Sequence, residues 1–396
     1  MRITNFTNTY KPAINGVVTS ISLFNKGLAE AGHRVHMIVP QYDATLEDEE
    51  PYVFRFPAID LTNSLNTSLP VPFKSYMEPT IYGLKPDVIH SQHPFLLGDV
   101  ASSFAQELRI PLIFTYHSHY DEYPQQYLRF APDFSSKIVE RIIRRYLVKC
   151  THVIAPTPSV RNRIYEFGID VPVSVIPTPI DFNDYQRLEP SRVRDNYQYG
   201  DNILFLYVGR LSVEKNVKFL LRSFARIFKA RTSTRLLIVG DGPEQERLRC
   251  LSAELGISNA VRFAGAVPHS EVPHFAAAAD LLLFPSMQET QGLAVIEAMA
   301  AGTPVVAIRT PELTDVLTEG GGKLVKPDEK EFANEVISLI DDPDGLKNLG
   351  ERALKIVQKY TLYSAVERLI NVYEQAIMQV SKPRIKRKLA GPIRLS

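Results

Sequence analysis

Short apolar segments alternate with longer amphipathic segments along almost the whole chain. The first kind is typical of buried strands and the second of helices, so the alternation favours an α/β fold with parallel sheets. We expect strands at residues 2–6, 35–39, 53–56, 88–91, 112–116, 152–155, 173–176, 203–208, 236–239, 261–264, 281–284 and 305–308. We expect helices at residues 17–31, 135–150, 217–229, 243–255, 271–278, 293–301, 329–341, 344–359 and 362–380.

The chain divides most naturally into two domains, because 396 residues exceed one comfortable core. Residues 177–184 are rich in turn formers and lack periodicity, so the boundary is placed there, between domains at 1–178 and 179–361. The last helix can pack anywhere, including back across the first domain, and the basic segment 381–396 is expected to be loose. Two open α/β sheets usually bind ligands between their carboxyl edges.

Composition excludes several classes of protein. The formal charge of +1 argues against a dedicated nucleic-acid binder. Cys150 and Cys250 are the only cysteines and lack metal-ligand spacing, which favours a reducing, cytoplasmic location. The chain begins with a strand-like run where a signal peptide would have an apolar core, and no apolar stretch approaches ~20 residues. Any membrane contact is therefore expected to be peripheral.

The segment from residue 285 to residue 306 carries the strongest functional signal. A buried strand enters a short polar loop that contains Gly292, and a helix follows at once and stops at Gly302. A helix N-terminus in this setting presents free N–H groups to a phosphate. Glu289 and Glu297 bracket the loop, and carboxylates would repel a phosphate, so they should face neutral hydroxyl groups. A nucleotide sugar, with a diphosphate between two polyols, offers a phosphate to the helix start and hydroxyl groups to both Glu289 and Glu297.

Two further strand ends supply candidate residues. Gly16 follows the first strand, where it either approaches a ligand closely or begins an ordinary helix capped by Asn15 or Thr19. No G-x-G-x-x-G motif accompanies it, which weakens a hydride-transfer function. Arg210 and Lys215 follow the first strand of the second half, and together they can neutralise a departing diphosphate. The alternative is a solvated loop with ordinary surface ion pairs.

Histidines lie near the ends of the fourth and fifth expected strands. His117 can hydrogen-bond a sugar hydroxyl or hold a proton. His119, His90 and His93 also suggest zinc, but further ligands at sensible spacing are not evident. Asp-x-Asp, which would hold a metal-bound diphosphate, occurs only at residues 342–344, where a turn is expected. We therefore expect neither a metal nor another cofactor.

These motifs resemble those of the retaining glycosyltransferases of family four, which have the GT-B architecture of two Rossmann-like domains. The likeness extends from residue 15 to the helix after residue 301, and its most specific element is the glutamate pair inside PSMQETQGL. The resemblance implies that Arg210 and Lys215 bind the diphosphate and that His117 faces the reacting sugar. It also implies that Glu289 binds hydroxyls of the transferred sugar and Glu297 the ribose. The remaining donor contacts that it implies are Gly16, Val267 near the base, and the backbone of Thr290, Gln291, Gly292 and Leu293.

Within the family, the chain looks closest to the diacylglycerol glycosyltransferases, which attach glucose or galactose to a lipid at a membrane surface. Residues 15–17, 116–123 and 289–293 carry this likeness, although Asp121 and Glu122 reverse the usual glutamate-then-aspartate order. The expected donor is a UDP-hexose and the expected acceptor a lipid hydroxyl. A glycosyltransferase with a non-lipid acceptor, a sugar-nucleotide epimerase and a non-catalytic nucleotide-sugar sensor remain alternatives.

The helix at 137–149 agrees with a lipid acceptor. It has an apolar face and basic residues on the rest of its surface, which suits anionic headgroups. These basic residues are Lys137, Arg141, Arg144, Arg145 and Lys149. The basic C-terminal segment can add to this attraction. The alternative is a plain amphipathic core helix followed by a solubilising tail.

Overall fold

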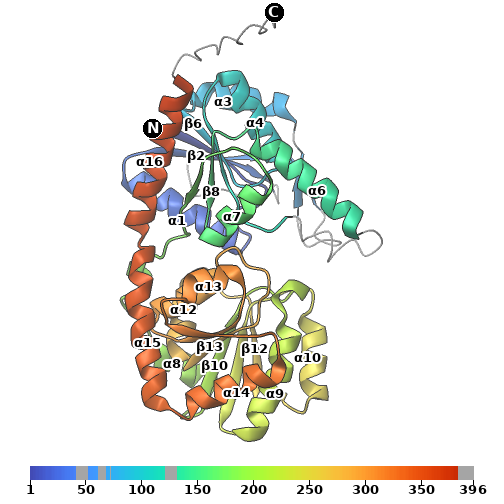
Figure 1. Ribbon diagram of the computed structural model, residues 1–396, viewed down its shortest axis with the longest axis vertical. Helices are drawn as coiled ribbons and strands as arrows, with labels where there is room; N and C mark the ends of the chain where they lie inside the picture. The colour runs from blue at the N-terminus through green and yellow to red at the C-terminus, as the bar shows by residue number, and fades with distance from the viewer. Residues whose placement is uncertain (42–51, 61–67, 72, 121–131, 382–396) are drawn as a thin grey trace, which may run out of the picture.

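The first half of the chain builds a seven-stranded parallel sheet (Figure 1). The computed structural model describes residues 1–41, 52–60, 68–71, 73–120 and 132–381. The strand order is β3-β2-β1-β6-β7-β8-β9. Strands are thus added first to one side of β1 and then, from β6 onward, to its other side. The strands are β1 (Arg2–Phe6), β2 (Arg34–Pro40), β3 (Val53–Phe56), β6 (Val88–Ser91), β7 (Leu112–Thr115), β8 (His152–Ala155) and β9 (Val173–Val175). The helices around them are α1 (Gly16–Glu30), α3 (Lys74–Leu84), α4 (Leu97–Leu108), α6 (Pro132–Leu147) and α7 (Pro158–Glu166).

The second half builds a six-stranded parallel sheet with the order β12-β11-β10-β13-β14-β15. Its strands are β10 (Ile203–Val208), β11 (Thr234–Val239), β12 (Val261–Gly265), β13 (Leu281–Phe284), β14 (Val305–Ile308) and β15 (Gly322–Val325). Its helices are α8 (Pro190–Asn196), α9 (Val217–Ala230), α10 (Gln245–Glu254), α11 (Val272–Ala278), α12 (Leu293–Ala300), α13 (Pro311–Leu317), α14 (Glu329–Ile340) and α15 (Pro343–Val357). The central strands are buried on both faces by separate apolar clusters.

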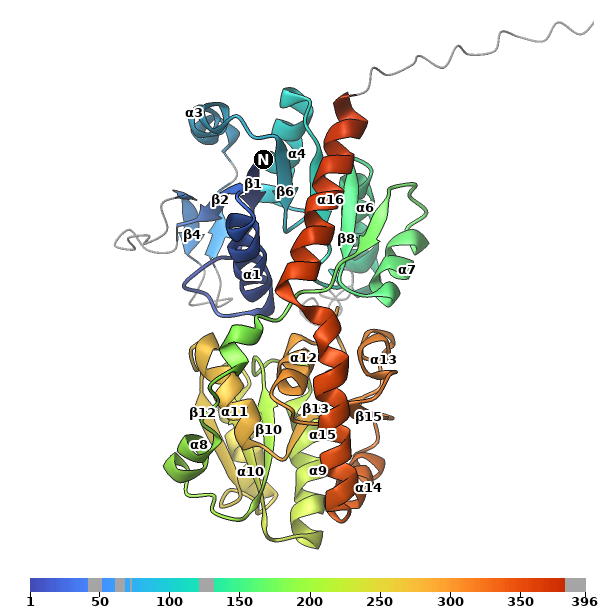
Figure 2. The ribbon, with the colours of Figure 1, turned by 90° about the vertical axis from the view of Figure 1, so that its left-hand side faces the viewer.

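The last helix, α16 (Leu362–Ser381), returns to the first domain. Figure 2 shows it running from the second domain up along the first. Leu369 and Val372 pack in one apolar cluster with Ile3 and Ile113 of the first sheet. The helix therefore joins the two domains, because its apolar side chains are buried against the first domain.

The expected α/β fold with two Rossmann-like domains is confirmed. Three strands were not expected from the sequence: β15 and the antiparallel pair β4 (Ala58–Asp60) and β5 (Ser68–Pro70). β15 has the sequence GKLV and so begins with a glycine and a lysine, which leaves it without the apolar run of the central strands. Residues 121–123 and the basic segment 382–396 lie outside the described residues.

No helix within the described ranges is both long enough and apolar enough to cross a bilayer. The two cysteines do not pair, because both are free thiols, Cys150 buried and Cys250 exposed.

Candidate active site

The carboxyl ends of the two sheets meet at the interface between the domains. In both sheets the order in which strands are added changes direction at the centre, between β1 and β6 and between β10 and β13. Ligands of open α/β sheets bind at such switch points. The loop after β13 lies against loops of the first domain. The hydroxyl of Thr290 donates to the carbonyl of His117 over 3.0 Å, and the hydroxyl of Thr157 donates to the carbonyl of Thr290 over 3.1 Å.

Lys215 and Glu289 form an ion pair at this interface. The Nζ atom of Lys215 lies 2.5 Å from Oε1 of Glu289, and both side chains are largely buried. Lys215 belongs to the turn that follows β10, and Glu289 to the loop that follows the neighbouring strand β13. The pairing of these two strands therefore brings the cation and the carboxylate together.

Arg210 lies on the same β10 loop and is exposed to solvent. Its carbonyl accepts a hydrogen bond from the hydroxyl of Tyr207 over 3.1 Å, which fixes the backbone of the loop. Within the described part of the chain, no ion pair engages its guanidinium group. This leaves Arg210 available for an anionic ligand.

Gly292 forms the N-cap of α12 in a left-handed conformation, with φ of 76°. A Cβ atom at this position would lie 2.6 Å from Cδ2 of Leu313, so both the backbone conformation and the neighbouring side chain oppose any residue other than glycine. Leu293 follows as the first residue of α12. The backbone N–H groups at this helix start carry the partial positive charge that suits a phosphate.

The side chain of Gln291 has a structural partner. It is buried, accepts a hydrogen bond from the amide of Thr178 over 2.8 Å and donates one to the carbonyl of Thr178 over 3.0 Å. Because Thr178 begins the connection between the domains, this pair ties the loop to the crossover. Any ligand contact of Gln291 is left to its backbone, as is that of Thr290, whose hydroxyl is occupied by His117.

His119 and Glu312 were not expected to contribute to this loop. Nε2 of His119 donates to the carbonyl of Glu289 over 3.0 Å and lies 3.3 Å from Oε1 of Glu312, and both side chains are buried. Burial alone would raise the pKa of Glu312, but hydrogen bonding by His119 and the backbone together hold that pKa below its usual value. The sequence placed His119 only in a possible metal motif, because contacts between domains leave no local pattern.

Glu297 is buried on α12 and is held by His269. Nε2 of His269 lies 2.6 Å from Oε1 of Glu297, and this hydrogen bond raises the pKa of His269. Tyr185 stands near the same carboxylate. His269 was also missed, since a histidine after Pro268 in a turn carries no motif.

Val267 precedes His269 on the loop after β12. Its side chain is partly buried against the core of the second domain, which leaves its backbone for a ligand.

Gly16 is the first residue of α1, and Oδ1 of Asn15 caps that helix by accepting from the amides of Val17 and Val18. Gly16 thus begins an ordinary capped helix, and this does not decide whether a ligand approaches it, because nothing lies within 4 Å of a Cβ atom built on Gly16.

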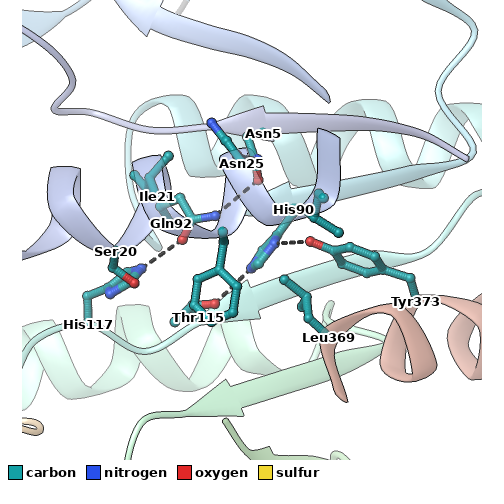
Figure 3. Close-up of a pocket in the computed structure, with 12 residues that line it drawn as sticks. Asn5, Ser20, Ile21, Asn25, His90, Gln92, Thr115, His117, Leu369 and Tyr373 are labelled. Atoms are coloured by element: carbon teal, nitrogen blue, oxygen red, sulfur yellow. Dashed lines mark hydrogen bonds between the residues drawn. The ribbon is translucent and has the colours of Figure 1, made fainter. Parts of the chain in front are cut away.

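The ring of His117 is hydrogen-bonded to a side chain of the first domain. Nε2 of the ring lies 2.7 Å from Oε1 of Gln92, as Figure 3 shows. Burial, aided by His93 and His90, lowers the pKa of His117 well below the ordinary value. The ring is therefore neutral at physiological pH. Within the described ranges, no group of three or more histidine, cysteine or carboxylate side chains is arranged to hold a metal ion.

The basic residues of α6 lie on an outer surface of the first domain, and Figure 1 shows this helix on the opposite side from α16. All are exposed: Lys137, Arg141, Arg144 and Arg145, as is Lys149 just beyond the end of the helix. Ile138 and Ile142 lie among them and are 42% and 38% exposed, whereas Ile143 faces the core. The helix thus presents an outer surface that is both cationic and apolar.

Known proteins with similar sequences and folds identify the family of this chain. Residues 14–184 match the family described as Glycosyltransferase Family 4, and residues 192–356 match Glycosyl transferases group 1. The alpha-monoglucosyldiacylglycerol synthase of Streptococcus pneumoniae is 30% identical over 352 residues, which cover 87% of this chain and 79% of that protein. The synthase of the same name from Acholeplasma laidlawii is 29% identical over 366 residues, which cover 89% and 92%.

Among solved structures, HepE of Anabaena in complex with UDP and glucose matches with a TM-score of 0.79 at 21% identity, covering 95% of this chain and 100% of that one. Its likeness shows the fold. Two Rossmann-like domains that meet at the carboxyl ends of their sheets define a GT-B enzyme. The chain belongs to glycosyltransferase family 4, among the group 1 glycosyl transferases.

Proposed function

We propose that this glycosyltransferase moves a hexose from UDP-glucose or UDP-galactose to a hydroxyl of a diacylglycerol-type lipid, with retention at the anomeric carbon. The ion pair of Lys215 and Glu289 at the domain interface carries the proposal, because it sets a cation for the diphosphate beside a carboxylate for the sugar. The names of two relatives that align over most of the chain support a glucosyl donor and a diacylglycerol acceptor.

The diphosphate is the leaving group, and three features favour its departure. Lys215 has three N–H donors, so it can keep its bond to Glu289 and still reach a phosphate oxygen. Arg210 offers a planar fork for a second oxygen. The start of α12 at Gly292 adds the positive end of the helix dipole. Charges arranged before the reaction stabilise a developing anion most effectively.

The reaction forms one bond and breaks one. The bond between the anomeric carbon and the diphosphate oxygen breaks first, which gives a sugar with oxocarbenium character. The acceptor hydroxyl then attacks from the same face, and its proton passes to the departing diphosphate oxygen. Glu289 and His117 hold the sugar during this exchange, and no metal is required.

The other donor contacts come from α12, from the loops after β12 and β13, and from the start of α1. Glu297, held by His269, binds the ribose, and the backbone at Val267 meets the base. The backbone of residues 290–293 contacts the sugar and the phosphates. The first turn of α1 at Gly16 has open space on its outer side, which suits a phosphate or the acceptor.

The lipid acceptor is supported by the surface of α6. Exposed isoleucines among five basic residues can insert at the level of anionic headgroups, and each basic residue near the surface contributes about 1 kcal/mol. This arrangement would hold the protein peripherally at the cytoplasmic face of a membrane, within reach of a lipid hydroxyl.

Incubation with labelled sugar nucleotides tests the function. The donors are UDP-glucose, UDP-galactose and GDP-mannose, each with anionic vesicles that contain or lack diacylglycerol, and each without vesicles. We expect labelled glycolipid only with a UDP-hexose and diacylglycerol. Label in a water-soluble product would indicate another acceptor, and a changed sugar in the donor without an acceptor would indicate an epimerase. Donor binding without turnover on any acceptor would identify a sensor.

A further inference from the structure

A row of hydrogen bonds leads from the ring of His117 into the first domain (Figure 3). Nε2 of His117 lies 2.7 Å from Oε1 of Gln92, and Nε2 of Gln92 donates to Oδ1 of Asn5 over 3.1 Å. Nδ2 of Asn5 donates to Oδ1 of Asn25 over 3.0 Å, and Nδ2 of Asn25 donates to the sulfur of Met37 over 3.1 Å. The side chains come from the loops after β7 and β6 and from β1, α1 and β2, and several line a small cavity of about 10 Å³.

The sulfur of Met37 fixes the direction of the whole row. A thioether has lone pairs and no hydrogen to donate, so the end of Asn25 that faces it must be the NH₂ group. The oxygen of Asn25 then faces Asn5, which must turn its own NH₂ group toward it and its oxygen toward Gln92. The same step leaves the oxygen of Gln92 facing Nε2 of His117. Amide orientations that are ambiguous one by one are thus determined together.

Because a carbonyl oxygen can only accept, Nε2 of His117 must carry a hydrogen. The ring is neutral, since desolvation of this partly buried side chain lowers its pKa and its titratable neighbours, His90 and His93, carry no negative charge. His90 is itself occupied by the hydroxyls of Tyr373 and Thr115, at 2.7 and 2.8 Å. A neutral imidazole with hydrogen on Nε2 has a lone pair on Nδ1, and no side chain or amide of the described residues donates to it.

We propose that Gln92, Asn5, Asn25 and Met37 are positioning residues that lock His117 in the Nε2–H tautomer, so that Nδ1 accepts a hydrogen bond from a hydroxyl of the transferred hexose. This inference rests on the proposed function, since it takes a sugar as the ligand. An acceptor at this point selects a hydroxyl over hydrogen or fluorine at one carbon of the sugar. A neutral ring also avoids placing a positive charge beside the oxocarbenium-like carbon, which an imidazolium would repel.

The tautomer is measurable without any substrate. Nitrogen-15 NMR of the full-length protein, with His117 assigned by the His117→Ala variant, should show a neutral ring with hydrogen on Nε2 from pH 5.5 to 8. Gln92→Met replaces the acceptor by an apolar side chain of similar shape and should give a mixture of tautomers. Gln92→Glu places a carboxylate beside the ring, which should raise the pKa of His117 and protonate it near neutral pH. Gln106→Glu, on the exposed face of α4, is the matched control and should change neither.

Kinetics then separate positioning from a merely structural role. With Gln92→Glu, we expect kcat to fall about 100-fold at pH 6 and to recover as the pH rises and the ring loses its proton. With Gln92→Met, kcat should fall without such recovery. A series of monodeoxy donors should reveal one hydroxyl whose removal costs the wild type about 10-fold or more in kcat/KM and costs His117→Ala little.

Two results would overturn the inference: a hydrogen on Nδ1 of His117 in the wild type, or an unchanged Nε2–H tautomer in Gln92→Met. If a Gln92 variant does not fold, Met37→Leu tests the same point, because it removes only the acceptor at the far end of the row. It should loosen the amide of Asn25 and weaken the tautomer preference, and a preference as strong as in the wild type would contradict the inference. The Nε2–H tautomer in a protein without transferase activity would refute the proposed function and leave the positioning row standing.

Discussion

The Nζ atom of Lys215, in the turn after β10, lies 2.5 Å from Oε1 of Glu289, in the loop after β13. The two side chains are only 24% and 12% exposed, so water screens the pair weakly. In the free protein each charge neutralises the other. In the proposed function, the sugar and the diphosphate of a bound donor share these two groups, so donor binding changes the charge balance of the site.

The pair predicts non-additive effects of substitution. Lys215→Met and Glu289→Gln should each lower the free energy of unfolding, and the double variant should lose less than the sum, by about 1 kcal/mol. Urea unfolding of the four proteins measures this coupling. The pair of Lys218 and Glu244, whose lysine is more exposed than Lys215, is the control for effects of charge alone. Strict additivity at Lys215 and Glu289 would mean that the pair does not form in solution.

Substitutions at two glycines distinguish an effect on stability from an effect on donor binding. Gly292→Ala should lower the free energy of unfolding by about 1–2 kcal/mol or more, because the left-handed backbone and the side chain of Leu313 both oppose a methyl group. Gly16→Ala has open space, so its free energy of unfolding should stay the same or rise by a few tenths. If the donor approaches Gly16, kcat/KM of that variant should fall by roughly 10-fold. Unchanged kcat/KM would remove Gly16 from the donor site.

The bond between His269 and Glu297 predicts a dependence of stability on pH. The folded pKa of His269 is raised above its ordinary value, mainly by this hydrogen bond. Its stabilising contribution should therefore be complete below about pH 6.5 and should disappear as the pH rises through the folded pKa. The difference in unfolding free energy between wild type and His269→Gln, measured from pH 5.5 to 9, should shrink with rising pH. A difference that grows with pH would reverse the sign and contradict the pairing.

The outer surface of α6 predicts binding to anionic vesicles. Replacing Arg141, Arg144 and Arg145 together by Gln should weaken partitioning on the order of 100-fold, at about 1 kcal/mol for each residue. Co-sedimentation with vesicles that contain phosphatidylglycerol measures this. The matched control replaces three basic residues of α9, Arg222, Arg226 and Lys229, by Gln. Equal losses in both triple variants would show that total charge, and not α6, governs binding.

Part of the site could be predicted because the carboxyl ends of parallel strands share one edge of a sheet. Lys215 and Glu289 each follow a strand in the sequence, and the adjacency of β10 and β13 brings them together. The helix start at Gly292 was equally visible, since a buried strand, a polar loop and a helix follow one another there. Local patterns of this kind are set by burial and backbone conformation, which the sequence expresses directly.

The contacts that hold the site in place could not be predicted. His119 and Glu312 belong to different domains, and their approach depends on how the two sheets are oriented. His269 and Glu297 are joined by a turn with no sequence signature. For Gln291, the structure reveals a structural partner, Thr178, where the resemblance implied only a ligand contact. Side-chain partners over such distances follow from the packed tertiary structure and not from any local period.

The central claim is that the cations at the domain interface stabilise the departing diphosphate, and single-turnover kinetics of Lys215→Ala test it most directly. The account predicts that the rate constant for transfer from UDP-glucose falls by about 100- to 1,000-fold, whereas the dissociation constant of the donor changes only a few-fold. Lys218→Ala, on the neighbouring helix α9, should retain the wild-type rate. A rate constant for Lys215→Ala equal to that of the wild type, in a folded protein with donor bound, would contradict the account.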